Sequence, residues 1–240
     1  MTLDTPRAAK PTKGGPAAAL ARVDTWVFDL DNTLYPATSN LFHQIDRRMG
    51  QYIAGLLGLD AVAARKLQKD YFRTYGTTLR GLMVHHGVDP RAYLDFVHDI
   101  DLAVMDPAPL LDAALAGLEG RKIIFTNASR DHAEAVIRRL GIARHFDAIF
   151  DIHDALYVPK PEEETYDRFI AAHGIVPAGT ALFEDTVANL APAHARGMVT
   201  VLIRPGEDGV ENDSTAAHVH HVADDLAAFL KGLARAARDG

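Results

Sequence analysis

The sequence predicts an α/β protein: a Rossmann-like, doubly wound parallel sheet with an inserted helical cap domain. From residue 110 onward, helical patterns alternate with short apolar runs, as in a parallel sheet that helices cover on both faces. Before that region, one helical pattern follows another without an intervening strand, which indicates an all-helical insertion. We therefore expect three parts: a disordered N-terminal tail at 1–22, a core at 23–35 plus 106–240, and a helical cap at 36–105.

The first strand is expected at the apolar run Thr25–Phe28, and the cap helices begin after Pro36. In the first of these helices apolar residues recur every four positions from Leu41 to Ile53, and the pattern ends near Gly58. Three further cap helices are expected over residues 60–75, 78–86 and 90–98.

In the core, glycines stop most of the helical patterns and a short apolar run follows each stop. Helices are expected over residues 110–118, 131–140, 162–173 and 187–196, and strands over 122–125, 148–150, 180–183 and 199–203. Val219–Val222 is the expected last strand, and a final helix is expected over 225–236.

The composition excludes several classes of function. A net charge of −7 argues against nucleic acid or an anionic membrane as the main partner. No apolar stretch approaches the ~20 residues that span a bilayer. The sequence has no cysteine, which excludes disulfides and thiol catalysis and fits a cytoplasmic protein. The tail at 1–22 contains prolines and glycines, and we expect no targeting signal in it.

The most informative segment follows the first strand. Asp29 and Asp31 are one residue apart, and side chains at i and i+2 of an extended chain point to the same side. Both carboxylates can therefore face the crevice at the carboxyl ends of the strands, where open α/β sheets bind ligands. A solvated turn is the alternative interpretation of this pair taken alone.

Three further polar segments lie at corresponding places. Thr126 and Asn127 follow one strand, Glu184 and Asp185 end another, and Lys160 lies between them in a Pro-Lys-Pro turn. Four such segments in this order favour a single phosphate and metal site over four coincidences.

In this order the segments resemble the motifs of the haloacid dehalogenase superfamily of phosphotransferases, over about residues 23–230. Asp31–Pro36, Tyr75–Leu79 and Phe125–Ala128 resemble more narrowly its pyrimidine 5′-nucleotidase-like branch. The resemblance implies that Asp29 is a nucleophile that forms an aspartyl-phosphate. It also implies that Asp31 acts as general acid and then as general base, for which its pKa must be raised, and we expect the neighbouring charge of Asp29 to raise it.

The resemblance further implies a Mg²⁺ site. Its expected ligands are the side chains of Asp29 and Asp185 and the backbone carbonyl of Asp31, with Glu184 binding directly or through water. Glu184 bonding a loop amide is the structural alternative. Thr126, Asn127 and Lys160 are the expected phosphate-binding residues, helped by the start of the following helix.

Substrate contacts from the cap are expected from Arg80, Arg47, His43 and Thr77, although a plain inter-helix turn and a solvated helix face are equally compatible with the pattern. Arg48 is expected to be solvated. His218, His220 and His221 do not form a metal site by pattern, because neighbouring strand residues alternate faces and no acidic or cysteine partner is suitably spaced.

The sequence therefore predicts a Mg²⁺-dependent phosphomonoester hydrolase whose partner is a small phosphorylated metabolite, with a pyrimidine nucleoside 5′-monophosphate as the favoured substrate. A sugar phosphate or phosphoglycolate is the alternative within the same fold. A 2-haloacid dehalogenase would leave Asp31 without a role, and a phospho-aspartate signalling module would explain neither Asp31 nor the cap.

Overall fold

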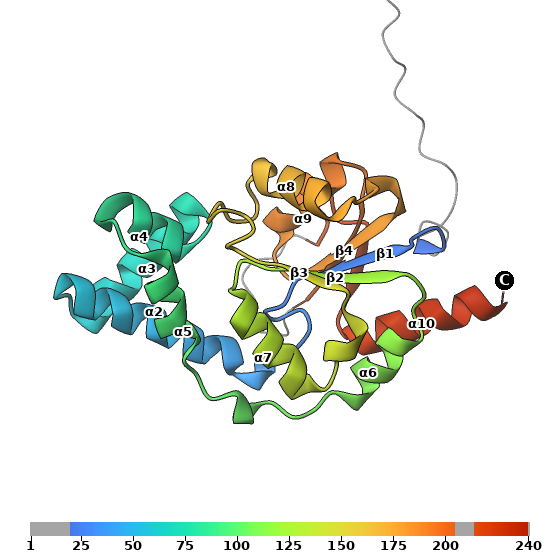
Figure 1. Cartoon of the computed structure of the whole chain (residues 1–240), viewed down its shortest axis with the longest axis horizontal. Helices are drawn as coiled ribbons and strands as arrows, with labels where there is room; N and C mark the ends of the chain where they lie inside the picture. Colours follow the sequence, from blue (N-terminus) through green and yellow to red (C-terminus); the bar gives the residue numbers. More distant parts are fainter. Residues whose placement is uncertain (1–19, 205–213, 240) are drawn as a thin grey trace, which may run out of the picture.

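The structure is a computed structural model that describes residues 20–204 and 214–239 (Figure 1). Most of the tail expected at 1–22 lies outside the described residues. Leu20 is described, however, and it is buried in the main hydrophobic core. The expected boundary at residue 22 is therefore wrong, because ordered structure already includes Leu20.

Six strands form one sheet in which every neighbouring pair is parallel. The strands are β1 (Thr25–Phe28), β2 (Arg121–Phe125), β3 (Ala148–Phe150), β4 (Thr180–Glu184), β5 (Val199–Ile203) and β6 (His221–Ala223). Their order across the sheet is β3-β2-β1-β4-β5-β6. The chain therefore winds outward in both directions from β1, and the predicted fold class is confirmed.

Helices cover both faces of the sheet, as Figure 1 shows. On one face lie α6 (Pro109–Ala116), α7 (Arg130–Leu140) and α10 (Leu226–Asp239). On the other face lie α8 (Glu163–His173) and α9 (Val187–Ala195). Successive side chains of the central strand β1 point to opposite faces of the sheet. Trp26 and Phe28 pack in the cluster with α6, α7 and α10, and Val27 packs in the cluster with α8 and α9. All four residues of β1 are buried, and Trp26, Val27 and Phe28 are apolar because both faces of the strand are covered.

Between β1 and β2 the chain forms a helical insertion, which we define as α2 to α5. Its helices are α2 (Leu41–Leu57), α3 (Ala61–Tyr75), α4 (Thr78–His86) and α5 (Pro90–His98). Asp60 and Asp89 cap two of them by accepting hydrogen bonds from backbone N–H groups, and glycines in the left-handed region follow α2 and α4.

The last strand begins later than Val219, where the sequence analysis expected it. The N–H of Val219 bonds the carbonyl of Ala216 in a turn, and the His220 ring accepts from the N–H of Thr200. These contacts occupy the segment before β6, which is why regular pairing starts only at His221. Within the described residues, no helix is both long enough and apolar enough to cross a membrane.

Candidate active site

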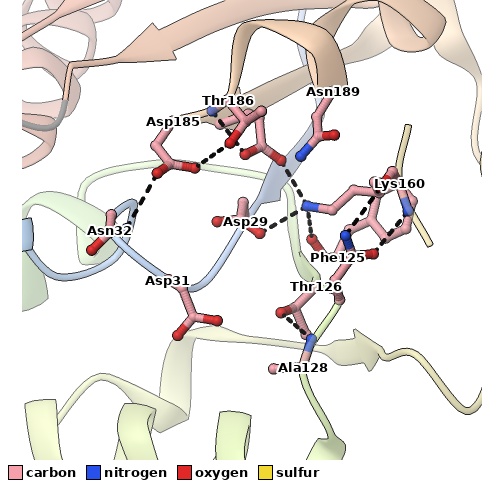
Figure 2. Close-up of polar contacts among 12 residues, drawn as sticks. Asp29, Asp31, Asn32, Phe125, Thr126, Ala128, Lys160, Asp185, Thr186 and Asn189 are labelled. Atoms are coloured by element: carbon pink, nitrogen blue, oxygen red, sulfur yellow. Dashed lines mark hydrogen bonds and ion pairs between the residues drawn. The ribbon is translucent and has the colours of Figure 1, made fainter. Parts of the chain in front are cut away.

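The carboxyl ends of neighbouring strands bring the predicted polar residues together (Figure 2). Asp29 directly follows β1, and its N–H bonds the carbonyl of Phe183 in β4. Thr126 follows β2, and Asp185 follows β4. Lys160 reaches the same place from the loop after β3. The four segments singled out in the sequence thus converge at one point of the sheet edge.

Lys160 lies at the centre of this group with only 1% of its surface exposed. Its Nζ donates to Asp29 Oδ1 at 2.7 Å, to Glu184 Oε2 at 2.7 Å and to the Phe125 carbonyl at 2.8 Å. Burial alone would lower the pKa of this ammonium group, but the two carboxylates raise it above its ordinary value. Lys160 is therefore a permanent positive charge bonded to the carboxylate of Asp29.

The side chain of Asn127 holds the loop that carries Lys160. Its Oδ1 accepts from the Lys160 N–H at 2.8 Å, and its Nδ2 donates to the Lys160 carbonyl at 3.2 Å. These two contacts leave the second hydrogen of Nδ2 for another acceptor, so the role of Asn127 as a phosphate donor stays a prediction. The hydroxyl of Thr126 accepts from the Ala128 N–H at 3.0 Å, so Thr126 shapes the turn before α7.

Three acidic side chains form a cluster suited to a metal ion. Ligand oxygens of Asp29, Glu184 and Asp185 lie within 4.8 Å of one another. Burial and the charge of Glu184 raise the pKa of Asp29 to about 7, against the opposing effect of Lys160, and similar causes raise the pKa of Asp185 well above its usual range. The cluster has three carboxyl groups and one neighbouring ammonium group, Lys160, so a divalent cation with oxygen ligands fits the residues present.

Glu184 differs from the other two carboxylates because both of its oxygens accept bonds from the protein. Oε2 accepts from Lys160, and Oε1 accepts from the Thr186 N–H at 3.1 Å. The loop-amide contact is the structural alternative stated for this residue in the sequence analysis. The nearby amide of Asn32 is only partly paired. Its Nδ2 contacts Asp185 Oδ2 at 3.4 Å, whereas its buried Oδ1 has no hydrogen-bond partner among the described residues. A metal-bound water beside Asp185 would satisfy that oxygen.

Asp31 has surroundings of its own. Tyr35 donates to its Oδ1 at 2.5 Å, and His132 Nε2 lies 3.4 Å from the same oxygen. Burial would raise the pKa of Asp31, but the contacts with His132 and Tyr35 hold it below its ordinary value. The expectation that Asp29 raises the pKa of Asp31 is therefore wrong for these surroundings: within the pair, it is Asp29 whose pKa is raised.

Sequence reasoning missed Tyr35, His132 and His98. The last residue of α5, His98, stacks on His132 with ring centroids 4.2 Å apart and planes at 14°. Burial and the neighbouring His132 lower the pKa of His98 to about 3. Tyr35 stood inside the first motif, but no spacing in the sequence connects His98 with His132, because they meet only when the insertion touches the core.

The cap candidates have different surroundings. His43 and Arg47 are exposed on α2, and among the described residues neither side chain has a hydrogen bond or ion pair. Thr77 caps α4 by accepting from the Arg80 N–H at 3.2 Å, and the guanidinium of Arg80 has no hydrogen bond or ion pair within the described part of the chain.

Arg48 was expected to be solvated, and that expectation is wrong. Its guanidinium bonds the Phe96 carbonyl and Asp99 and lies over the Phe96 ring, so it joins α2 to α5. His218 and His220 bond Val187 and Thr200, and the acidic cluster at Asp29 is the one group of metal-ligating side chains found among the described residues.

Comparison with known proteins finds relatives of this chain, among them a yeast and a bacterial protein. Phosphate metabolism protein 8 of Saccharomyces cerevisiae is 27% identical over 209 residues, which cover 80% of this chain and 65% of the yeast protein. Fructose-1-phosphate phosphatase YqaB of Escherichia coli is 28% identical over 123 residues, which cover 49% of this chain and 64% of YqaB. The chain thus spans slightly less than two thirds of the length of these relatives.

Solved structures share the fold. The hydrolase YfnB of Bacillus subtilis, whose crystal structure has bound magnesium, superposes with a TM-score of 0.57 at 16% identity, over 88% of this chain and 99% of that one. Finally, a family model for haloacid dehalogenase-like hydrolases matches residues 23–197, from the residues before β1 to the end of α9.

Proposed function

Since this chain belongs to the haloacid dehalogenase-like hydrolases, we propose that it is a Mg²⁺-dependent phosphomonoester hydrolase that works through an aspartyl-phosphate on Asp29. The observation that carries the proposal is the buried Asp29 carboxylate, bonded to Lys160 and set among two further acidic side chains with Asp31 beside it. The yeast and Escherichia coli relatives, whose names refer to phosphate metabolism and to a phosphatase, support the same reaction class.

In the first half-reaction an oxygen of Asp29 bonds to phosphorus while the bond from phosphorus to the leaving oxygen breaks. Asp31 gives its proton to that oxygen, and the alcohol departs. A bound phosphate dianion adds negative charge beside Asp31, which raises its pKa toward the protonated state that this step needs. Lys160 keeps one oxygen of Asp29 in place and offsets charge at the phosphoryl group.

In the second half-reaction a water oxygen bonds to phosphorus as the bond to Asp29 breaks. Asp31 takes a proton from this water, so both carboxyl groups return to their starting states and phosphate leaves. Positioned acid–base catalysis of this kind contributes about 10²–10⁴ in rate.

Asp29 and Asp185 would hold Mg²⁺ with the backbone carbonyl of Asp31, and Glu184 would act through water because both of its oxygens are already bonded. When bound, the ion neutralises charge on the phosphoryl oxygens and so lets the anionic Asp29 approach. The magnesium in the YfnB structure supports this choice of metal.

We propose that the helical insertion serves as the cap and selects the leaving group, with a pyrimidine nucleoside 5′-monophosphate as the favoured substrate. The second candidate is a sugar phosphate, which the name of the YqaB relative favours. Initial rates on nucleotides, sugar phosphates and phosphoglycolate with Mg²⁺ separate the two.

Asp29→Asn tests the reaction class. We expect kcat to fall by about 10³-fold or more, because an amide attacks phosphorus poorly and binds metal weakly. EDTA should silence the wild type, and added Mg²⁺ should restore it. Asp167→Asn, which removes an exposed carboxylate from α8, is the matched control and should retain wild-type rates. Wild-type turnover by Asp29→Asn would exclude the aspartyl-phosphate route.

A further inference from the structure

One oxygen of Asp31 is held by two donors. The Tyr35 hydroxyl donates to Oδ1 at 2.5 Å, and His132 Nε2 reaches the same atom at 3.4 Å. An ionised carboxylate only accepts, so Nε2 of His132 carries a hydrogen in this contact. Among the described residues, no hydrogen bond reaches the other oxygen, Oδ2. The two donors therefore fix the rotation of the carboxyl group and reserve Oδ2 for proton transfer.

His132 is itself fixed by a residue of the insertion. The His98 ring stacks on it in near-parallel geometry, and His98 Nδ1 lies 2.9 Å from the hydroxyl of Ser129. Ser129 is the residue before α7, and its hydroxyl also accepts from the backbone N–H of His132. His98 thus contacts both the ring and the backbone anchor of His132.

The stacked pair crosses the boundary between the insertion and the core. His98 ends α5, whereas His132 and Ser129 lie at the start of α7. A cavity of about 250 Å³ adjoins the pair between these two helices, and His98, Ser129 and His132 line it. His98 ends α5 and His132 lies in α7, so a shift of α5 relative to α7 would separate the two rings.

We propose that His132 is a positioning residue for Asp31 and that His98, which belongs to the insertion, holds the His132 ring in place. Asp31 then transfers protons efficiently only while the insertion is docked on the core. The proposal rests on the phosphatase function proposed above and adds how its acid–base step depends on the insertion. In that step Oδ2 gives its proton to the leaving oxygen as the ester bond breaks, and later takes one from water as the bond to Asp29 breaks.

Phosphate esters with different leaving groups test the role of His132 in proton transfer by Asp31. An aryl phosphate such as p-nitrophenyl phosphate releases a stable phenolate and needs little help from an acid, whereas an alkyl phosphate needs the proton. Misplacing a catalytic group by about 1 Å can cost 10²-fold. His132→Phe keeps a ring for stacking but has no donor. We expect it to lower kcat/KM on an alkyl phosphate at least tenfold more than on the aryl phosphate.

Rescue and a second variant sharpen the test. His132→Gln retains an N–H donor near the place of Nε2 and should recover most of the alkyl activity. His98→Ala removes the stack and should shift the alkyl-to-aryl ratio in the same direction by a smaller factor. The control is His145→Phe, because His145 also pairs with an aspartate, Asp112, at 2.8 Å, but outside the site. That variant should leave the ratio unchanged.

The ratio of alkyl to aryl phosphate activity is measured within each preparation. A smaller folded fraction lowers both rates equally and leaves this ratio unaltered. Equal losses on the two esters in both His132→Phe and His98→Ala would overturn the proposal and leave a packing role for the pair. If His132→Phe fails to fold, His98→Ala alone decides by the same ratio. If the wild type hydrolyses neither ester, the proposed phosphatase function itself fails, and this inference with it.

Discussion

Asp29 and Asp31 leave β1 together, but different parts of the chain surround them. Asp29 lies against Glu184 and Lys160, and burial among acidic groups raises its pKa. Asp31 lies against Tyr35 and His132, whose donors lower its pKa. These directions are the opposite of what a nucleophile and a general acid need. A cation held by Asp29 would lower the pKa of Asp29, and a phosphate dianion beside Asp31 would raise the pKa of Asp31, so the two proposed roles depend on those partners.

This contrast shows which features of single residues could be predicted from the sequence and which could not. Asp29 and Asp185 were predicted as site residues because each follows a strand, and strand ends meet at one edge of the sheet. Lys160 was predicted from its order between two of the other segments. Partners were not predictable in the same way. The pKa of Asp31, for example, depends on its contact with His132, which lies more than a hundred residues away in the chain.

Asp31→Asn should separate the two half-reactions. With an aryl phosphate the first step needs little acid help, whereas the second step loses its base. A rapid-quench experiment should therefore show a burst of phenol close to one equivalent per enzyme, followed by slow turnover. The wild type supplies the control, with no burst or a smaller one. A slow release of phenol without a burst would place the base at another residue.

At the scale of elements, helix ends were predicted well where the chemistry is local. The aspartate before α3 and the Asp-Pro pair at the start of α5 mark their helices by capping and by the fixed φ of proline. The start of the last strand was predicted too early in the chain, because it depends on the contact between His220 and the distant Thr200. Local signals thus set helix boundaries, and tertiary contacts set the edge of the sheet.

A buried aspartate joins two helices of the insertion. Asp46 of α2 accepts from Arg65, Gln68 and Lys69 of α3, and its side chain is only 10% exposed. Burial would raise the pKa of Asp46, but hydrogen bonds from Lys69 and Arg65 hold it below its ordinary value. A lowered pKa in the folded state adds stability above the unfolded pKa, and that stability is lost as the pH falls through the folded value.

Asp46→Asn should therefore destabilise the protein by about 1–2 kcal/mol at neutral pH, a figure reduced because both cations are partly exposed. The difference from wild type should be full above about pH 5 and should shrink below about pH 4. Urea unfolding followed by circular dichroism at several pH values measures it. Asp95→Asn, on the exposed side of α5, is the matched control. A pH-independent difference would assign the loss to packing alone.

At the scale of the whole molecule, the insertion rests on the loop that carries Lys160. Gly76, in the turn between α3 and α4, has φ +78°, and a Cβ built there would lie 3.3 Å from the Lys160 carbonyl and 3.4 Å from Pro159. This close approach places the start of α4 beside Lys160. The sequence predicted this turn as a contact loop, and its nearness to Lys160 supports that hypothesis.

Arg80→Ala tests whether this turn selects substrate. Arg80 lies in the first turn of α4, and its guanidinium is free of bonds to other described residues. We expect the variant to lower kcat/KM for the preferred nucleotide at least tenfold, or about 1.4 kcal/mol, with little change on a small aryl phosphate. Arg73→Ala removes an arginine that is paired with Asp70 on α3 and should change neither rate. A parallel fall on both substrates would assign Arg80 to the core site or to the fold.

The central place of β1 has a consequence for how the protein is made. On the ribosome this strand is the first to emerge, yet its two neighbours, β2 and β4, are encoded far downstream. At ordinary elongation rates the wait for Thr180–Glu184 lasts on the order of ten seconds. Throughout that time the apolar run Thr25–Phe28 lacks its β4 partner, and Glu184 is not yet available to Lys160. The pairing of β1 with β4 and the bond between Lys160 and Glu184 therefore form only after residue 184 has been made.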